Sequence, residues 1–139
     1  MITKFNIFEN FAFQLDSEKS QAGVKVLHIL AQLQIFHWQT PKMSVHKTVD
    51  EYIDKFKENA DKLLEVIQGK YGRIVIGENT YIPIRNIDDI DPYTFANQCI
   101  DVFEMYKNNI FLNDAEIITI IDEIITDLQQ LKYLLSFGG

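Results

Sequence analysis

Hydrophobic residues recur at intervals of three and four along most of the chain, which is the spacing of one face of an α-helix. Four stretches show this pattern, at residues 17–40, 45–71, 92–107 and 114–137. In the second stretch the apolar positions are Val49, Ile53, Phe56, Ala60, Leu63, Leu64 and Ile67. Each stretch therefore has one face that can pack against a core, and the pattern predicts four helices.

Residues that end or start helices stand between these stretches. Pro41 disfavours a helical conformation at the residue before it, and Gly72 follows the second stretch. Asp91-Pro92 supplies an N-cap followed by proline at the first helical position, and Asn113 with Glu116 three residues later resembles a capping box. The first two helices, and also the last two, are thus expected to be joined by short links.

Residues 72–91 have a different character. Arg73-Ile74-Val75-Ile76 and Tyr81-Ile82-Pro83-Ile84 are rich in β-branched residues and flank Gly77-Glu78-Asn79-Thr80. Such a sequence is typical of a small β-hairpin, whose second strand would lie at an edge because Pro83 has no N–H to donate. We therefore expect a long crossover that contains a small hairpin.

The order of these elements indicates the fold. Two helices with a short link, a long crossover, and two more helices with a short link resemble the one-crossover four-helix bundle of ferritin-like folds. With 139 residues, of which 47% are hydrophobic, the chain can bury one sizeable core. We expect an all-α fold in which residues 17–139 form a single four-helix-bundle domain.

An N-terminal arm, residues 1–16, precedes this domain. It carries Phe5, Phe8, Phe11 and Phe13 with little regular period. An exposed cluster of aromatic side chains favours association. We therefore expect the arm to contact the bundle or a neighbouring subunit.

The charge of the chain argues against several function classes. Thirteen Lys and Arg residues against 20 Asp and Glu residues give a formal net charge of −7. This sign opposes attraction to phosphate backbones and anionic lipids, so no nucleic-acid partner is expected. No apolar run is long enough to span a membrane, and the N-terminus lacks the form of a signal peptide. We expect a cytoplasmic protein without membrane association.

Four potential metal ligands lie at regular intervals on the second predicted helix. His46 and Asp50 are four residues apart, as are Asp61 and Glu65, so each pair lies on adjacent turns of one face. The eleven residues from Asp50 to Asp61 make about three full turns, which aligns all four side chains along one edge. The two inner ligands are about 16 Å apart, however, too far to bind one ion. One helix therefore supplies two half-sites.

The two pairs share a centre. The midpoint of His46 and Glu65 is position 55.5, and so is the midpoint of Asp50 and Asp61. If two copies of this helix pack antiparallel about a two-fold axis near that point, His46 faces Glu65 of the second copy and Asp50 faces its Asp61. Two complete sites then form in a two-fold dimer. His37, shortly upstream of His46, is placed to add an imidazole to each.

This donor set restricts the choice of metal. Two imidazoles and three carboxylates suit Fe(II), Mn(II) or Zn(II), and no thiolate is present to favour softer ions. Carboxylates can bridge two irons, stabilise Fe(III) as the charge rises and leave positions open for an oxidant. We therefore expect iron, with Zn(II) or Mn(II) as alternatives.

A known family has the same pattern of residues. His37-Trp38-Gln39, followed by His46, Asp50, Asp61 and Glu65, resembles the ferroxidase signature of Dps-type mini-ferritins. The resemblance covers residues 20–71 well and 114–137 more weakly. It implies two-fold dimers assembled into a dodecameric shell that stores iron. It further implies that His37, His46 and Asp50 of one subunit, with Asp61 and Glu65 of its mate, bind Fe(II) for oxidation by peroxide or dioxygen, as the metal ligands and catalytic residues of a ferroxidase.

The chain also departs from that family. The interval from His37 to His46 is shorter, and residues 73–84 resemble a hairpin where the family has a short helix. No lysine-rich tail is present, so the DNA association of some members is not expected. The strings Gln68-Gly69-Lys70-Tyr71-Gly72-Arg73 and His37-Trp38-Gln39-Thr40 are also similar to uncharacterised phage-encoded proteins. A phage origin would place the protein in a host cytoplasm or a virion.

Two alternatives use the same fold. A non-catalytic structural or assembly protein, viral or cellular, would reuse the bundle, with the arm and the hairpin making contacts. A Zn-stabilised dimer of the same geometry would lose stability in a chelator. The residues alone leave both open.

Overall fold

The computed structural model describes residues 17–137 of the chain. The predicted arm, residues 1–16, lies outside the described residues. The described range contains the helices α2 (Ser17–Gln39), α3 (Met43–Tyr71), α4 (Pro92–Met105) and α5 (Ala115–Leu135), and a π-helical turn, η1 (Tyr106–Ile110), that continues α4. None of these described helices is both long and apolar enough to cross a membrane. The all-α prediction is confirmed.

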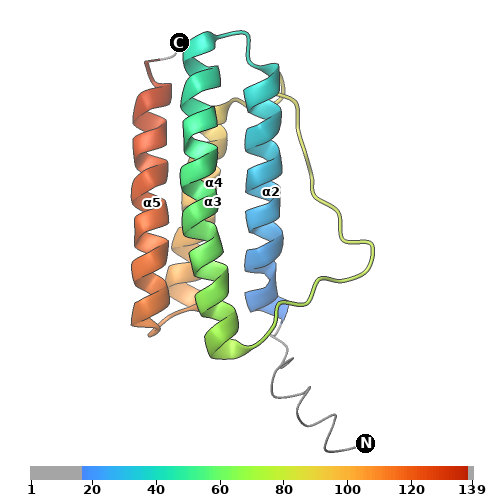
Figure 1. Cartoon of the computed structure of the whole chain (residues 1–139), viewed down its shortest axis with the longest axis vertical. Helices are drawn as coiled ribbons and strands as arrows, with labels where there is room; N and C mark the ends of the chain where they lie inside the picture. Colours follow the sequence, from blue (N-terminus) through green and yellow to red (C-terminus); the bar gives the residue numbers. More distant parts are fainter. Residues whose placement is uncertain (1–16, 138–139) are drawn as a thin grey trace, which may run out of the picture.

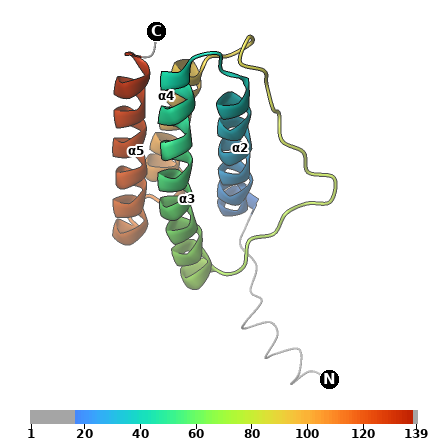
Figure 2. The same ribbon diagram turned by 45° about the horizontal axis from the view of Figure 1, so that its top comes forward.

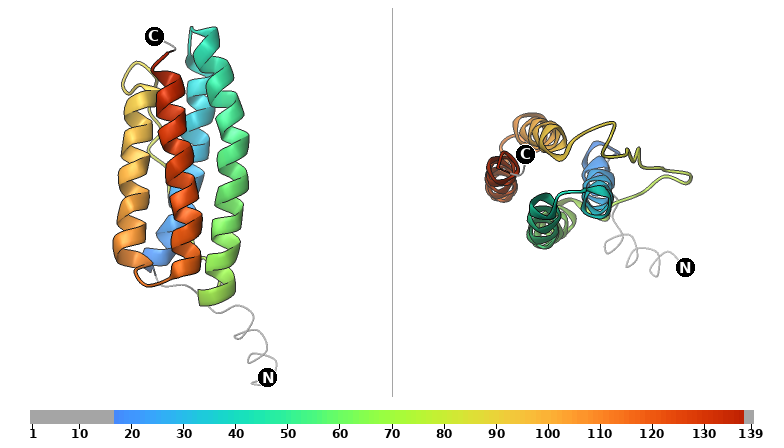
Figure 3. Two further views of the ribbon diagram at one scale, coloured as in Figure 1. Left: turned by 90° about the vertical axis from the view of Figure 1, so that its left-hand side faces the viewer. Right: turned by 90° about the horizontal axis from the view of Figure 1, so that it is seen from above.

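The helices form a bundle with one crossover. α2 and α3 are antiparallel neighbours, and residues 72–91 return the chain along the outside of α2 to the end at which α3 began (Figure 1). α4 therefore runs in the same direction as α3, and α5 runs back beside it (Figure 2). Seen from the end, the order round the bundle is α2, α3, α5, α4 (Figure 3). Of the four neighbouring pairs, α2 and α4 make the fewest contacts.

One apolar core fills the bundle. Its largest fully buried apolar side chains are Phe36, Phe56, Phe103, Phe111, Ile29, Leu63, Ile67, Ile117, Ile121, Ile124 and Leu128. Aromatic rings meet edge-on across the core, with 5.6 Å between the ring centroids of Phe36 and Phe95 and 6.3 Å between those of Phe56 and Phe103. This geometry is favourable for aromatic pairs. It links α4 to both α2 and α3.

The predicted hairpin in the crossover is wrong. In residues 72–91 the backbone forms turns and irregular coil, with an isolated bridge at Arg73, and the two β-branched runs form no strands. Instead, the buried amide of Gln32 on α2 donates to the backbone oxygen of Arg85 at 2.8 Å and accepts from its N–H at 2.8 Å. A buried amide needs both hydrogen bonds, and a peptide group can supply them. The Gln32 side chain thus makes the two backbone hydrogen bonds that a neighbouring strand would make in a hairpin.

The start of α5 differs by one residue from the predicted capping box. The N-cap is Asp114 rather than Asn113, and Asp114 Oδ1 accepts from the backbone N–H of Ile117 at 3.2 Å. Asn113 instead adopts a left-handed conformation with φ of 73°. Asp114 also accepts hydrogen bonds from Lys70 Nζ, at 2.9 Å, and from the hydroxyl of Tyr71. The cap therefore ties the start of α5 to the end of α3.

We predict that Gln32→Leu destabilises the protein and loosens the crossover. Leucine occupies similar space but leaves the N–H and C=O of Arg85 without their partner, at a cost of about 1–2 kcal/mol. Gln129→Leu, at an exposed glutamine of α5, is the matched control. Urea denaturation and hydrogen exchange at the Arg85 amide measure the effect. Equal stability and equal exchange in the two variants would contradict this role of Gln32.

Candidate metal centre

The turn between α2 and α3 brings His37 and His46 together. α2 ends at Gln39 and α3 begins at Met43, so the two imidazoles lie on either side of a short link. Their rings stack with 3.9 Å between centroids and 20° between planes. Two histidines nine positions apart in the sequence are therefore in direct contact.

The hydrogen bonds of the two imidazoles fix which ring nitrogen is protonated. His37 Nδ1 lies 3.1 Å from the backbone oxygen of His46, and His46 Nδ1 lies 2.8 Å from the backbone oxygen of His37. A carbonyl oxygen can only accept, so each Nδ1 donates and each neutral ring carries its lone pair on Nε2. Histidines that bind metals commonly donate their other ring N–H in this way. Both Nε2 atoms are therefore in the state that a metal ion requires.

Asp50 adds a carboxylate to this pair. It lies one turn beyond His46 on α3, and its Oδ1 is 3.8 Å from Nε2 of His37. The His37 side chain is mostly covered, with 15% of its surface exposed, whereas that of Asp50 is 65% exposed. The two imidazoles and the carboxylate thus lie near one another on the outer side of the α2–α3 turn, but they do not by themselves form a group that could hold a metal ion.

Asp61 and Glu65 lie away from this cluster within the chain. Both are exposed on α3, and the eleven residues between Asp50 and Asp61 correspond to about 16 Å along the helix. In residues 17–137 no group of three or more His, Cys, Asp or Glu side chains could hold a metal ion. A complete site would therefore need ligands from outside the described chain.

The interior of the bundle has the wrong donors for a metal site. Ferritin-like di-iron proteins hold their metals between the helices with Glu and His side chains. Among the described residues, the buried polar or charged side chains are Ser20, Gln32 and Asp114, and Asp114 already caps α5. Cys99 is also buried, and burial raises the pKa of its thiol to about 12. The described interior therefore lacks the Glu and His donors of such a di-iron site.

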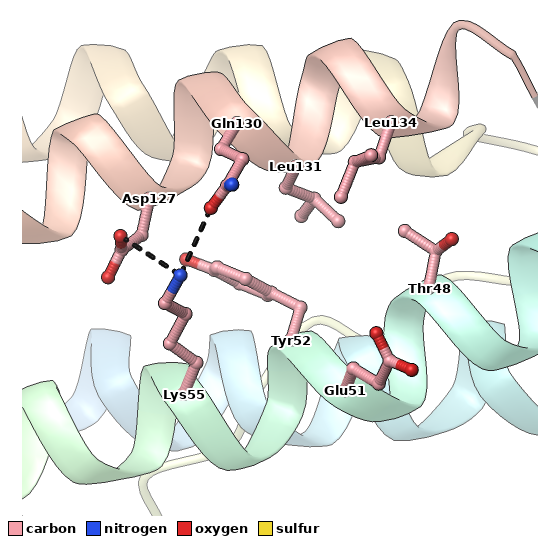
Figure 4. Close-up of a pocket in the computed structure, with 8 residues that line it drawn as sticks. All are labelled: Thr48, Glu51, Tyr52, Lys55, Asp127, Gln130, Leu131 and Leu134. Atoms are coloured by element: carbon pink, nitrogen blue, oxygen red, sulfur yellow. Dashed lines mark hydrogen bonds and ion pairs between the residues drawn. The ribbon is translucent and has the colours of Figure 1, made fainter.

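A second polar feature lies between α3 and α5. A pocket of about 180 Å³ opens there, and the ring of Tyr52 extends across it toward Lys55, Asp127 and Gln130 (Figure 4). Lys55 Nζ donates to Gln130 Oε1 at 3.0 Å and lies 3.5 Å from Asp127 Oδ1. These contacts hold the two helices together at the rim of the pocket.

The hydroxyl of Tyr52 has no hydrogen-bond partner among the described residues. Burial is the main cause that raises its pKa well above the usual value, so the group stays protonated at neutral pH. A buried hydroxyl without a partner costs stability. The tyrosines show no special spacing along the chain, so no sequence pattern distinguishes Tyr52 from the others.

We predict that Tyr52→Phe stabilises the protein by about 1 kcal/mol, because it removes an unpaired buried hydroxyl and keeps the packing of the ring. Tyr133→Phe, at a side chain that is 63% exposed, is the matched control and should change stability little. Guanidinium denaturation followed by circular dichroism measures both. Destabilisation by Tyr52→Phe would mean that the hydroxyl has a partner in solution.

Comparison with known proteins gives the family of the chain. Residues 37–135 match the model of a family of unknown function (DUF5856). No curated protein and no solved structure matches the chain. The matched region includes His37, His46, Asp50, Asp61 and Glu65. Because the match spans well over half of its length, the chain belongs to this family of unknown function.

Proposed function

We propose that the protein binds Fe(II) at a site shared by two copies of the chain and oxidises it, as Dps-type mini-ferritins do. The observation that carries the proposal is the arrangement of His37, His46 and Asp50. Both Nδ1 atoms donate to backbone oxygens, which leaves the lone pair of each neutral ring on Nε2, and Nε2 of His37 lies 3.8 Å from Asp50 Oδ1. These three donors form half of a mixed nitrogen and oxygen site of the kind that binds Fe(II).

A second copy of the chain supplies the missing carboxylates in this proposal. Asp61 and Glu65 are exposed on α3, and they share with Asp50 and His46 a midpoint at position 55.5. Antiparallel packing of two α3 helices about a two-fold axis at this point brings Asp61 and Glu65 of one copy to the imidazole end of the other. The dimer then contains two equivalent sites.

The outer face of α2 supports contact with a second copy. Leu27 and Trp38 on this helix are 52% and 69% exposed. With Ala31 and Gln34 they recur at intervals of four, three and four, which places them on one side of α2. Two exposed large apolar side chains on one side of a helix favour contact with another protein surface. Further assembly of such dimers into a closed dodecameric shell would give the ferric product a place to collect.

The chemistry follows from the donors. Fe(II) is the substrate, and each ion gives up one electron. Peroxide accepts two electrons and two protons, its O–O bond breaks, and two water molecules form; with dioxygen, four ions supply the four electrons that reduce it to water. Asp50, Asp61 and Glu65 offset the increased charge of Fe(III), while the neutral imidazoles of His37 and His46 hold the ion in place.

We predict that Asp61→Asn slows Fe(II) oxidation by roughly tenfold or more, because it removes an anionic ligand without changing the size of the side chain. Glu58→Gln, at another exposed carboxylate of α3, is the matched control and should leave the rate unchanged. The measurement is the absorbance of ferric product after peroxide is added to protein loaded with Fe(II) without oxygen. Equal rates in both variants would contradict the proposed site.

Mixed dimers distinguish a metal site shared by two copies from a metal site formed within a single chain. In a dimer of one His46→Ala chain and one Asp61→Asn chain, one of the two shared sites keeps all its ligands and the other loses two. We therefore predict that purified mixed dimers recover about half of the wild-type oxidation rate. Two differently tagged copies allow the purification. A rate no higher than that of either single variant would refute sharing between copies.

A non-catalytic assembly role is the second candidate. Trp38 and Met43, at the α2–α3 turn, are both 69% exposed, and Leu134 and Phe137, near the end of α5, are 43% and 69% exposed. These positions lie at the same end of the bundle (Figure 1). Exposed apolar groups gathered at one end suit contacts between proteins. Stoichiometric metal binding without oxidation, in the same assay, would favour this role or a dimer stabilised by Zn(II).

A further inference from the structure

The seam between α2 and α4 contains two adjoining hollows. One, of about 240 Å³, lies between α2, Tyr106 and the crossover, and the other, of about 400 Å³, lies between the start of α2, the end of α4 and η1. They share Gln21 and Tyr106, whose hydroxyl is 3.5 Å from the backbone oxygen of Gln21. α2 and α4 stand at neighbouring corners of the bundle, and the crossover passes along the outer side of α2 (Figure 3). The seam is thus walled by three parts of the chain.

Lys25 and His28 lie together in the first hollow. Lys25 Nζ is 3.2 Å from His28 Nδ1, so the ammonium donates and the imidazole accepts. The His28 ring also packs edge-on against Phe95, with 5.7 Å between centroids. Burial and the charge of Lys25 lower the pKa of His28, and a hydrogen bond to the backbone of Pro83 raises it by less. The lowered pKa favours the neutral ring at pH 7. The net charge of this pair is therefore that of Lys25.

The charge of Lys25 has no counter-charge within residues 17–137. Lys55, Lys70 and Lys107 each lie within 4 Å of a carboxylate, whereas Lys25 does not. The side chain of Lys25 is half-buried. Its positive charge also reaches the core: burial raises the pKa of the Cys99 thiol, and the charge of Lys25 partly offsets this increase. A partly buried cation whose hydrogen-bond partner is a neutral ring, with no counter-charge beside it, attracts an anion. In a chain of net charge −7 such a site is unusual.

Apolar surface leads away from this charge. Val24, Pro83 and the ring of Tyr106 line the first hollow with Lys25. Met105 and Ile110 line the second, where Glu18 and Asn109 add polar groups. Ile110 reaches the seam because η1 is a π-helical turn, a local widening of the helix that is frequent at functional sites. Binding sites for small molecules commonly combine apolar walls with a few polar groups that fix the orientation of the ligand. A single cation beside the apolar walls of the first hollow is such a combination.

We propose that the seam between α2 and α4 binds a small organic anion, a carboxylate with an apolar body, whose head group lies at Lys25 and whose body extends past Tyr106 toward Met105. The site is separate from the proposed metal centre. It faces α4 and the crossover, whereas His37 faces α3, and His28 and His37 are about 13 Å apart along α2.

The test uses the full-length protein with octanoate, and with octanol as a neutral ligand that has the same apolar body. Displacement of a fluorescent anilinonaphthalene sulfonate and isothermal titration calorimetry measure the affinities. We expect octanoate to bind in a saturable manner about tenfold more tightly than octanol, because a charge-assisted hydrogen bond holds its head group. Equal affinities for the two ligands, or no saturable binding of octanoate up to millimolar concentration, would overturn the proposal.

Variants locate the site. Lys25→Gln should weaken octanoate binding about tenfold and leave octanol binding unchanged, whereas Lys62→Gln, at an exposed lysine of α3, should change neither. Val24→Trp should block both ligands because it fills the hollow. Circular dichroism and thermal unfolding check that each variant is folded. Loss of octanoate affinity to the same extent in Lys25→Gln and Lys62→Gln, or full binding by Val24→Trp, would contradict this location.

Discussion

Mutual hydrogen bonding between His37 and His46 is the constraint on which the proposed metal centre depends. Each imidazole donates from Nδ1 to the backbone oxygen of the other residue, and the rings stack. The short link between α2 and α3 makes this exchange geometrically available. It fixes the tautomer of both neutral rings, so that Nε2 of each ring is the atom left free to bind a metal in the proposed site.

α2 separates the two proposed sites because different elements pack on its different sides. Toward α3 it carries His37, and on its outer face it carries the exposed Leu27 and Trp38, where a second copy is proposed to bind. On the other, the crossover is held by Gln32, and the weak contact with α4 leaves the hollows at Lys25. A helix that is apolar around much of its circumference can serve both sides, because each side is covered by a different partner.

Local rules predicted the helices, and long-range contacts explain what they missed. The spacing of Val49, Phe56 and Ala60 predicted α3, and all three are buried. The hairpin prediction failed because no rule about β-branched residues or turns takes account of a glutamine on another helix, more than fifty positions away in the chain, that bonds the crossover. The capping box failed by one residue because Asp114 also bonds Lys70 and Tyr71 at the end of α3. These interactions depend on how the helices are assembled.

In the candidate sites, too, local spacing predicted some features, and others depend on how the helices pack. Helical spacing placed His46 and Asp50 on adjacent turns, and the stacking of His37 on His46 became evident only from the path of the turn. His28 looked like an ordinary helix residue in the sequence, because Lys25, Phe95 and the crossover surround it only after the helices have packed.

The most direct test of the central claim is anomalous X-ray diffraction at the iron edge from crystals grown with Fe(II) in the absence of oxygen. The predicted result is iron bound by Nε2 of His37 and His46 of one copy and by Asp61 and Glu65 of a second copy. The account would be contradicted by crystals in which these carboxylates lie far from any His46 and no iron is bound between the chains.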